Sequence, residues 1–263
     1  MRTVDNLFIV NSALVVDRLS VFSTQDRITQ TAETLYSIAA FDAKMQTTSD
    51  VLVLDMSPTV SRDDLASMIE PILETRPNFK NMTFANIQTA DSVNAALAFN
   101  NRSMSELYGF TQFFRQQNEV DGDYSIPNIQ KRVGRVVKLS GRYRLSNHFL
   151  KIPFSTDKPM FQFAHPVPTW QNPKVLEHHL VDPPLWLYKL RLWCMNASLM
   201  DLYFEILNHS IEFSRFMDIE HCMFYMLNHI KARGDDWHRF DIHTYDKIGV
   251  QGYIAPSGEY IDE

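Results

Sequence analysis

The sequence lacks the features that mark membrane proteins, secreted precursors and general nucleic-acid-binding proteins. No apolar stretch in its 263 residues approaches the roughly 20 residues that a membrane-spanning helix needs. The apolar run at residues 7–10 is also too short for the core of a signal peptide. The net charge of −6 argues against a general nucleic-acid-binding protein, because phosphate backbones demand a basic face.

Several chemical signatures are absent as well. The two cysteines, Cys194 and Cys222, stand among apolar residues without metal-site spacing, so we expect reduced core residues of a cytoplasmic protein. No His-x-x-x-His or Cys-x-x-Cys pair suggests zinc. The chain contains no phosphate loop, no Gly-x-Gly-x-x-Gly turn and no Gly-x-Ser-x-Gly elbow, which argues against the common nucleotide fingerprints and against a serine hydrolase.

The chain does contain apolar runs typical of buried strands, which alternate with segments of helical periodicity. Strands are predicted at residues 7–10, 51–54, 79–87, 133–139 and 185–193, and helices at residues 26–38, 61–73, 103–114, 200–211 and 218–229. This alternation predicts an α/β fold with a mostly parallel central sheet and helices on both faces. The proline- and aromatic-rich stretch 151–184 predicts irregular, packed structure beside the site, and residues 247–259 predict a closing loop or hairpin.

The most informative stretch is residues 133–145, where the predicted strand stops abruptly at Ser140-Gly141. Lys138, Arg142 and Arg144 bring positive charge to the carboxyl end of that strand, the edge at which open α/β sheets bind ligands. Arginine and lysine suit a phosphorylated or nucleotide ligand. An ordinary strand, a turn and solvated basic side chains would explain the same residues.

Four blocks of sequence together resemble small bacterial and viral nucleotide-sugar glycosyltransferases of the lipopolysaccharide and capsule type, similar to the WavE-like group. They are residues 23–38, 138–145, 218–221 and 248–255, and the second block is the most specific. The resemblance implies a GT-A-like (Rossmann-like) fold in one compact unit. Residues 1–150 would bind the nucleotide-sugar, and residues 151–263 would bind the acceptor and supply the catalytic base.

The resemblance also implies a reaction and its partners. A sugar would pass from a nucleotide-sugar donor to a hydroxyl of a glycan acceptor such as a surface polysaccharide, a lipopolysaccharide or a glycoprotein glycan. We expect a monomer or homodimer that acts without nucleic acid. The alternative is a non-catalytic nucleotide- or glycan-binding protein that keeps the fold without turnover.

GT-A enzymes usually hold a divalent metal, manganese or magnesium, with an Asp-x-Asp motif at the end of a central strand. Here Ser140-Gly141-Arg142 stands at that place, without a carboxylate. Asp121-Gly122-Asp123 matches the motif literally, but it follows a polar helix end and predicts a turn. Our hypothesis is therefore metal-independent transfer, in which cationic side chains neutralise the leaving diphosphate. Metal dependence stays open as the alternative.

An inverting enzyme also needs a carboxylate base for the acceptor hydroxyl. Glu220 is the first candidate and Asp218 the second, because both lie at the start of the helix predicted at residues 218–229. At a helix N-terminus we expect Glu220 to have a depressed pKa and to stay ionised. Helix capping alone would explain the same residues.

The other candidate site residues stand at strand ends, helix starts or within the resembling blocks. The donor-binding candidates are Asn11, Ser12, Arg27, Gln30, Thr31, Asp55, Arg102, Lys138, Ser140, Gly141, Arg142 and Tyr143, and the acceptor-binding candidates are His221 and Gly252. At strand ends and helix starts, ordinary turn or cap duty would account for the same residue types.

Overall fold

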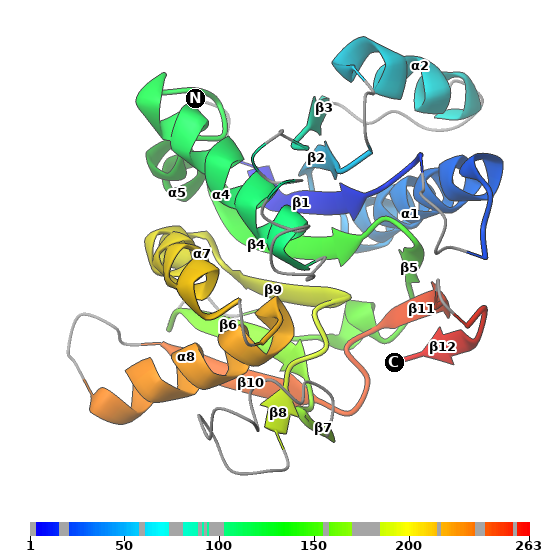
Figure 1. Ribbon diagram of the computed structural model, residues 1–263. Coiled ribbons are helices and arrows are strands. Elements are labelled where there is room, and N and C mark those ends of the chain that lie inside the picture. The colour runs from blue at the N-terminus through cyan, green and yellow to red at the C-terminus, as the bar shows by residue number, and fades with distance from the viewer. Residues whose placement is uncertain are drawn as a thin grey trace.

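The computed structural model describes residues 4–15, 21–57, 61–73, 81–88, 91, 94, 103–154, 158–169, 185–214, 217–234, 240–254 and 257–263. Its centre is a seven-stranded sheet in the order β10-β6-β9-β4-β1-β2-β3 (Figure 1). The strands are β1 (Val4–Ser12), β2 (Ser49–Asp55), β3 (Asn81–Asn86), β4 (Val133–Ser140), β6 (Met160–Ala164), β9 (Leu192–Asn196) and β10 (Asp241–Tyr245). Only β9 runs antiparallel to its neighbours in this sheet. The predicted α/β fold with a mostly parallel sheet is confirmed.

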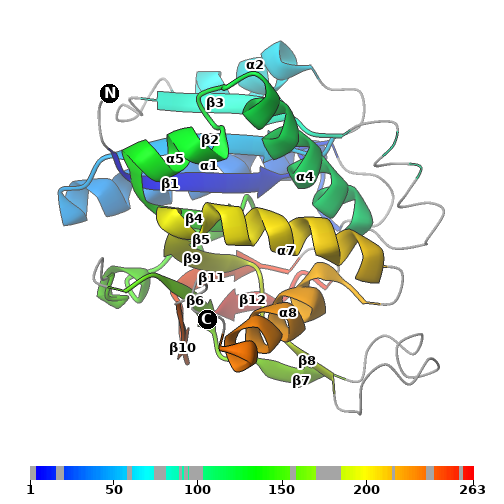
Figure 2. The same cartoon turned by 90° about the vertical axis from the view of Figure 1, so that its left-hand side faces the viewer.

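Helices cover both faces of the sheet, as predicted. Helices α1 (Thr24–Met45) and α2 (Arg62–Leu73) pack on one face, and α4 (Ser103–Glu119), α5 (Ile126–Arg132), α7 (Met200–Phe213) and α8 (Ile219–Arg233) pack on the other (Figure 2). Side chains alternate along each strand, so Phe8 and Val10 pack toward α1 whereas Leu7 and Ile9 pack toward α4. The two faces therefore carry separate hydrophobic layers. None of the helices in the described ranges could span a bilayer.

Two smaller sheets complete the described fold. Strands β5 (Tyr143–Leu145), β11 (Val250–Tyr253) and β12 (Tyr260–Asp262) form an antiparallel sheet on the α1 side, which confirms the predicted closing hairpin. Strands β7 (Val167–Thr169) and β8 (Leu185–Leu187) pair with each other. Single turns of 3-10 helix, η1 (Phe149–Lys151) and η2 (Ala197–Leu199), follow β5 and β9.

Two predictions about the middle of the chain were wrong. Residues 185–193 are divided between β8 and β9, because a turn at Leu190 and Arg191 separates the two apolar runs. The stretch expected to be irregular contains β6, a fully buried strand of the central sheet. The prolines at positions 153, 159 and 166 bracket β6 and do not interrupt its hydrogen bonds, so proline content alone was misleading.

The order of the strands reverses between β1 and β4. From β1 the chain moves through α1, β2, α2 and β3 toward one side of the sheet, and β4 then pairs with the other side of β1. Figure 1 shows β1 and β4 pointing in the same direction. Ligands of open α/β sheets bind outside the carboxyl ends of the strands at such a reversal. We therefore expect the site at the ends of β1 and β4.

The small sheet depends on a glycine that packs against η1. Gly249 has a φ of +100°, and a Cβ atom there would lie 2.1 Å from the backbone nitrogen of Phe149. We expect Gly249→Ala to lower the free energy of unfolding by at least about 3 kcal/mol, because the backbone it meets cannot yield. Gly234→Ala is the control, since Gly234 has a φ of +68° with no atom within 4 Å and should lose only about 1 kcal/mol. Urea denaturation measures both, and equal losses would contradict the packing described here.

Candidate functional site

The carboxyl ends of β1 and β4 lie against each other. Asn11 pairs with Ser140 in the strand register, and the backbone N–H of Gly141 donates a hydrogen bond of 2.6 Å to the carbonyl of Asn11. A Cβ atom at Gly141 would lie 3.0 Å from the Cβ of Ser12, so a larger residue would push the two strand ends apart. Three of the donor-binding candidates thus meet Gly141 at the reversal point.

Helix α1 fixes the turn that follows β4. The hydroxyl of Thr31 donates to the carbonyl of Gly141 (3.0 Å), and the hydroxyl of Thr34 donates to the carbonyl of Tyr143 (2.7 Å). Because both hydroxyls are buried, these bonds hold the turn rigidly on the helix. The candidate Thr31 therefore positions the backbone of residues 141–143.

Two arginines converge on this turn. Arg27, in the first turn of α1, is only 5% exposed, and its Nη1 donates to the side chain of Gln30 (3.3 Å). Burial, followed by the neighbouring charge of Arg142, lowers the pKa of Arg27 to about 10, so this side chain is still charged at neutral pH. Two like charges held close together raise the local affinity for an anion, and guanidinium groups match phosphate geometry.

Asp55 fastens the loops that follow β1 and β2. Its carboxylate accepts hydrogen bonds from the hydroxyl of Ser12, from the N–H of Leu14 (3.1 Å) and from the N–H of Ser57 (2.7 Å). The side chain is completely buried. Both carboxylate oxygens of Asp55 therefore already have donors, which gives this residue a structural role beside its predicted role in donor binding.

Lys138 lies on the opposite face of the sheet from Arg27. Its ammonium group donates to the carbonyl of Leu190 (3.0 Å) and lies 3.3 Å from a carboxylate oxygen of Glu106 on α4. A hollow of about 10 Å³, enough for one water molecule, adjoins it. Lys138 thus supplies positive charge near the carboxyl end of β4, on the face of the sheet where α8 begins.

The turn between β8 and β9 connects the end of β4 to the start of α8. The N–H of Ser140 donates to the carbonyl of Arg191 (2.8 Å), and the N–H of Leu190 donates to the carboxylate of Glu220 (3.2 Å). These bonds place Glu220 at the same edge as the turn after Ser140. The structure therefore brings the first base candidate to the edge that carries the donor-binding candidates.

The environment of Glu220 differs from the expectation. Burial raises the pKa of Glu220, and the nearby charge of Asp218 raises it further, whereas the Leu190 N–H, Lys138 and Arg191 oppose these effects. The predicted depressed pKa was wrong, because desolvation outweighs the favourable field of the helix N-terminus. A raised pKa brings a carboxylate closer to the range in which it can accept a proton efficiently near neutral pH.

Asp218 caps α8, as predicted. Its carboxylate accepts from the backbone N–H of His221 (3.1 Å) and lies 2.6 Å from Nδ1 of the same histidine. The side chain of His221 is 1% exposed. Both residues therefore have structural duties, and their predicted roles with the acceptor stay predictions.

The remaining candidates have different surroundings. A Cβ atom at Gly252 would lie 2.8 Å from the carbonyl oxygen of Arg142, so this glycine lets β11 pack against the turn. Arg102 lies outside the described residues. Asp121-Gly122-Asp123 forms the predicted turn between α4 and α5. This turn lies at the edge of the sheet where β4 begins, away from the carboxyl ends of β1 and β4.

The sequence analysis missed a third cationic group at this edge. The carboxylate of Glu263 lies 2.6 Å from the ammonium of Lys189 and 2.7 Å from the guanidinium of Arg191. The guanidinium groups of Arg191 and Arg142 lie 5.9 Å and 5.4 Å from the ring centre of Tyr143, which joins them into one cluster. The available signal was the pair of cations inside the apolar run 185–193, which marks the turn.

The described residues contain no ready-made cluster of metal ligands. No three histidine, cysteine or acidic side chains within the described ranges lie close enough together to ligate one. The oxygens of Asp55, the acidic residue at the end of β2, already accept hydrogen bonds from three donors. No step through a metal ion is derived from these residues.

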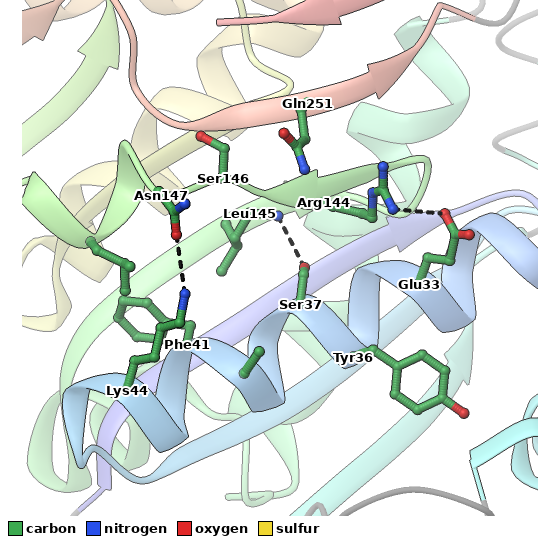
Figure 3. A pocket seen from close by; sticks show the side chains of 12 residues that line it. Glu33, Tyr36, Ser37, Phe41, Lys44, Arg144, Leu145, Ser146, Asn147 and Gln251 are labelled. Atoms are coloured by element: carbon green, nitrogen blue, oxygen red, sulfur yellow. Dashed lines mark hydrogen bonds and ion pairs between the residues drawn. The ribbon is translucent and has the colours of Figure 1, made fainter.

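A separate groove of about 330 Å³ lies between α1 and the segment from β5 to η1 (Figure 3). Its charged groups already have partners, because Arg144 lies 3.8 Å from Glu33 and Lys44 donates to Asn147 (3.1 Å). Figure 3 shows that the groove runs along the helix. Its lining does not include Arg27, Gly141 or Arg142, so it is distinct from the carboxyl ends of β1 and β4.

No family profile matches the sequence, and no curated protein matches it either. Among solved structures, the chain is similar to a glycosyltransferase involved in the glycosylation of the major capsid of PBCV-1. The two sequences are 8% identical, the match covers 91% of this chain and 82% of that chain, and the TM-score is 0.42. The galactosyltransferase LgtC in complex with donor and acceptor sugar analogs shows 11% identity, 83% and 68% coverage, and a TM-score of 0.44. The inositol-1-phosphate CTP transferase from T. maritima shows 13% identity, 93% and 86% coverage, and a TM-score of 0.40. Likeness this distant assigns neither a family nor an activity to the chain.

The raised pKa of Glu220 predicts a pH-dependent contribution to stability. A carboxyl group whose pKa is higher in the folded state favours folding while it is protonated, and this contribution is lost as pH rises from its unfolded value through its folded value. We therefore expect Glu220→Gln to gain stability relative to the parent protein as pH rises from 4 to 8. Chemical denaturation across this range measures the difference. Glu212→Gln, at an exposed position on α7, controls for the loss of one charge. A stability difference for Glu220→Gln that does not change with pH would contradict the partly buried environment of Glu220.

Proposed function

We propose that this protein is a glycosyltransferase that moves a sugar from a nucleotide-sugar to a hydroxyl of a glycan acceptor, with inversion and without a metal ion. The observation that carries the proposal is the pairing, at one sheet edge, of a rigid cationic turn with a carboxylate of raised pKa. The turn contains Gly141 and Arg142 beside Arg27, and the carboxylate belongs to Glu220.

The cationic turn suits the leaving group. As the bond between the sugar and the diphosphate breaks, negative charge develops on the diphosphate, and fixed cations stabilise it most where little rearrangement is needed. Arg27 and Arg142 meet this condition because Thr31 and Thr34 hold the turn on α1. Arg191 lies next to Tyr143 as well, but its guanidinium already pairs with Glu263, so Arg27 and Arg142 carry this role.

The carboxylate suits the acceptor. In an inverting transfer the acceptor oxygen bonds to the anomeric carbon while the bond to the diphosphate breaks, and the hydroxyl proton passes to a base. Glu220 would take this proton, and its hydrogen bond from Leu190 holds the carboxylate in place. Lys138 lowers the pKa of Glu220 and so favours its ionised form. Asp218 is the second candidate, although it already caps α8.

The sequence supports the same assignment independently. The most specific block of the resemblance, residues 138–145, contains the turn, and the block at residues 218–221 contains Glu220. The resemblance suggests an acceptor in surface polysaccharide, lipopolysaccharide or glycoprotein glycan synthesis, in the cytoplasm. The second candidate function is that of a non-catalytic nucleotide- or glycan-binding protein. The hydrogen bonds from the loops occupy both carboxylate oxygens of Asp55, and this favours a binding protein over an enzyme that holds a metal ion there.

Nucleotide binding that does not need a metal is the first testable consequence. We expect one of UDP, GDP, CDP or dTDP to raise the melting temperature by mass action, equally with manganese and with EDTA. Arg142→Ala should weaken binding of that nucleotide at least about tenfold, because it removes charge-assisted hydrogen bonds to phosphate. Arg144→Ala is the matched control, since Arg144 lies two residues along the chain but pairs with Glu33. A thermal shift that requires manganese would contradict the metal-free site.

The role of Glu220 separates an enzyme from a binding protein. We expect Glu220→Gln to keep the nucleotide affinity and to lower the rate of sugar transfer, or of nucleotide-sugar hydrolysis, by about 100-fold or more. Asp218→Asn should keep most of the activity, because asparagine also caps helices well. Release of nucleotide from the nucleotide-sugar measures the rate. If Asp218→Asn abolished turnover while Glu220→Gln did not, the base would be Asp218, and if the parent protein released no nucleotide, the binding-protein alternative would hold.

A further inference from the structure

Three aromatic side chains form a partly exposed ledge at the edge of the site, on the α1 side. Tyr253 of β11 and Tyr260 of β12 face each other across the hairpin with ring centres 5.1 Å apart, and each is 47% exposed. The ring of Phe22, just before α1, lies 6.4 Å from that of Tyr253. We call these three residues the aromatic ledge. Single exposed apolar residues are normal on a protein surface, but neighbouring rings beside the charged groups of Arg27 and Arg142 point to a binding surface.

The aromatic ledge adjoins the cationic turn. The guanidinium of Arg27 lies 5.4 Å from the ring centre of Phe22. Gly252, the residue before Tyr253, packs against the carbonyl of Arg142 and pairs with Tyr143. Figure 1 shows the β11–β12 hairpin beside β5, on the side toward which β1 and β4 point. An anion bound by the two arginines would therefore lie next to these rings.

The ledge and the base candidate lie on opposite faces of the central sheet. Arg27 and Tyr143 pack with α1, whereas Glu220 begins α8 and contacts the turn that Lys138 binds. Arg27 lies beside Phe22 and interacts with the charge of Arg142. Arg191 shares the ring of Tyr143 with Arg142 and interacts with the charge of Glu220. The arginines thus link the aromatic rings to the carboxylate. A nucleotide-sugar has the same order of parts, with its diphosphate between a planar base and a reactive sugar.

We propose that the aromatic ledge stacks the nucleobase of the donor, with Tyr253 as its central ring. This inference rests on the proposed function and adds the position of the base. With phosphates at Arg27 and Arg142, the sugar would point toward Glu220 and the base toward the ledge. An acceptor sugar fits the ledge less well, because the acceptor hydroxyl must reach Glu220 on the other face. Stacking on aromatic rings tolerates any base, since every base has a flat π face.

The test compares ligands with and without a base. Isothermal titration of UDP, GDP, CDP, dTDP and inorganic pyrophosphate would be run with the parent protein and with Tyr253→Leu, Tyr253→Phe and Tyr260→Ala. We expect Tyr253→Leu to weaken the best nucleoside diphosphate about tenfold or more, because it removes a stacking surface. Its affinity for pyrophosphate should not change. Tyr253→Phe should behave like the parent protein, since it keeps the ring.

Two control variants make the result specific. Tyr36→Ala removes a tyrosine from the α1 groove of Figure 3, and we expect it to leave both affinities unchanged. Arg142→Ala should weaken the nucleotide and pyrophosphate together, because it acts on the phosphates. Leucine retains apolar contacts in the hairpin, and Tyr260→Ala provides a second lesion in the ledge should Tyr253→Leu fold poorly.

The outcomes separate this inference from the proposed function. If the parent protein binds a nucleoside diphosphate and both ledge variants bind it equally well, the ledge does not hold the base, although the proposed function stands. If the ledge variants weaken pyrophosphate as much as nucleotide, the rings only support the arginines and the inference fails. If the parent protein binds no nucleotide and no pyrophosphate, the proposed function itself is overturned.

Discussion

The organisation of the site depends on the close approach of β4 to β1 at their carboxyl ends. The hydrogen bond from Gly141 to the carbonyl of Asn11 closes this contact, and the absence of a side chain at Gly141 allows it. Once the turn after β4 is fixed there, the hydroxyls of α1 hold it from one face. The turn between β8 and β9 meets the end of β4 within the sheet, through the bond from Ser140 to the carbonyl of Arg191. The two halves of the chain therefore meet at the turn after β4.

Burial and charge act together at this edge. The cations of Arg27, Arg142 and Arg191 gather beside the ring of Tyr143, and a partly desolvated carboxylate, Glu220, lies beyond them. Burying these charges is costly, and groups with perturbed pKa values cluster at functional sites. A ligand of opposite charge and a proton to be moved would account for both features.

Much of the fold could be predicted from local patterns. The apolar runs that became β1, β2 and β4 and the helical spacing of α4 and α7 depend on neighbouring residues alone, as does the Ser61 capping box at the start of α2. The turn at Leu190 and Arg191 and the strand β6 were missed, because their states depend on distant strands. The pairing of Glu263 with Arg191 and the raised pKa of Glu220 likewise arise from contacts distant in the sequence. Sequence could therefore suggest the cationic turn but not the groups that surround it.

The most direct test of the proposed nucleotide site is amide hydrogen exchange in the presence and absence of a nucleoside diphosphate. With the diphosphate at the turn after β4 and at the start of α1, binding should slow exchange at residues 141–143 and 27–31. Exchange along the groove between α1 and η1 should not change. Slower exchange only along that groove, or no change in exchange in either region, would contradict a nucleotide site at the reversal point of the sheet.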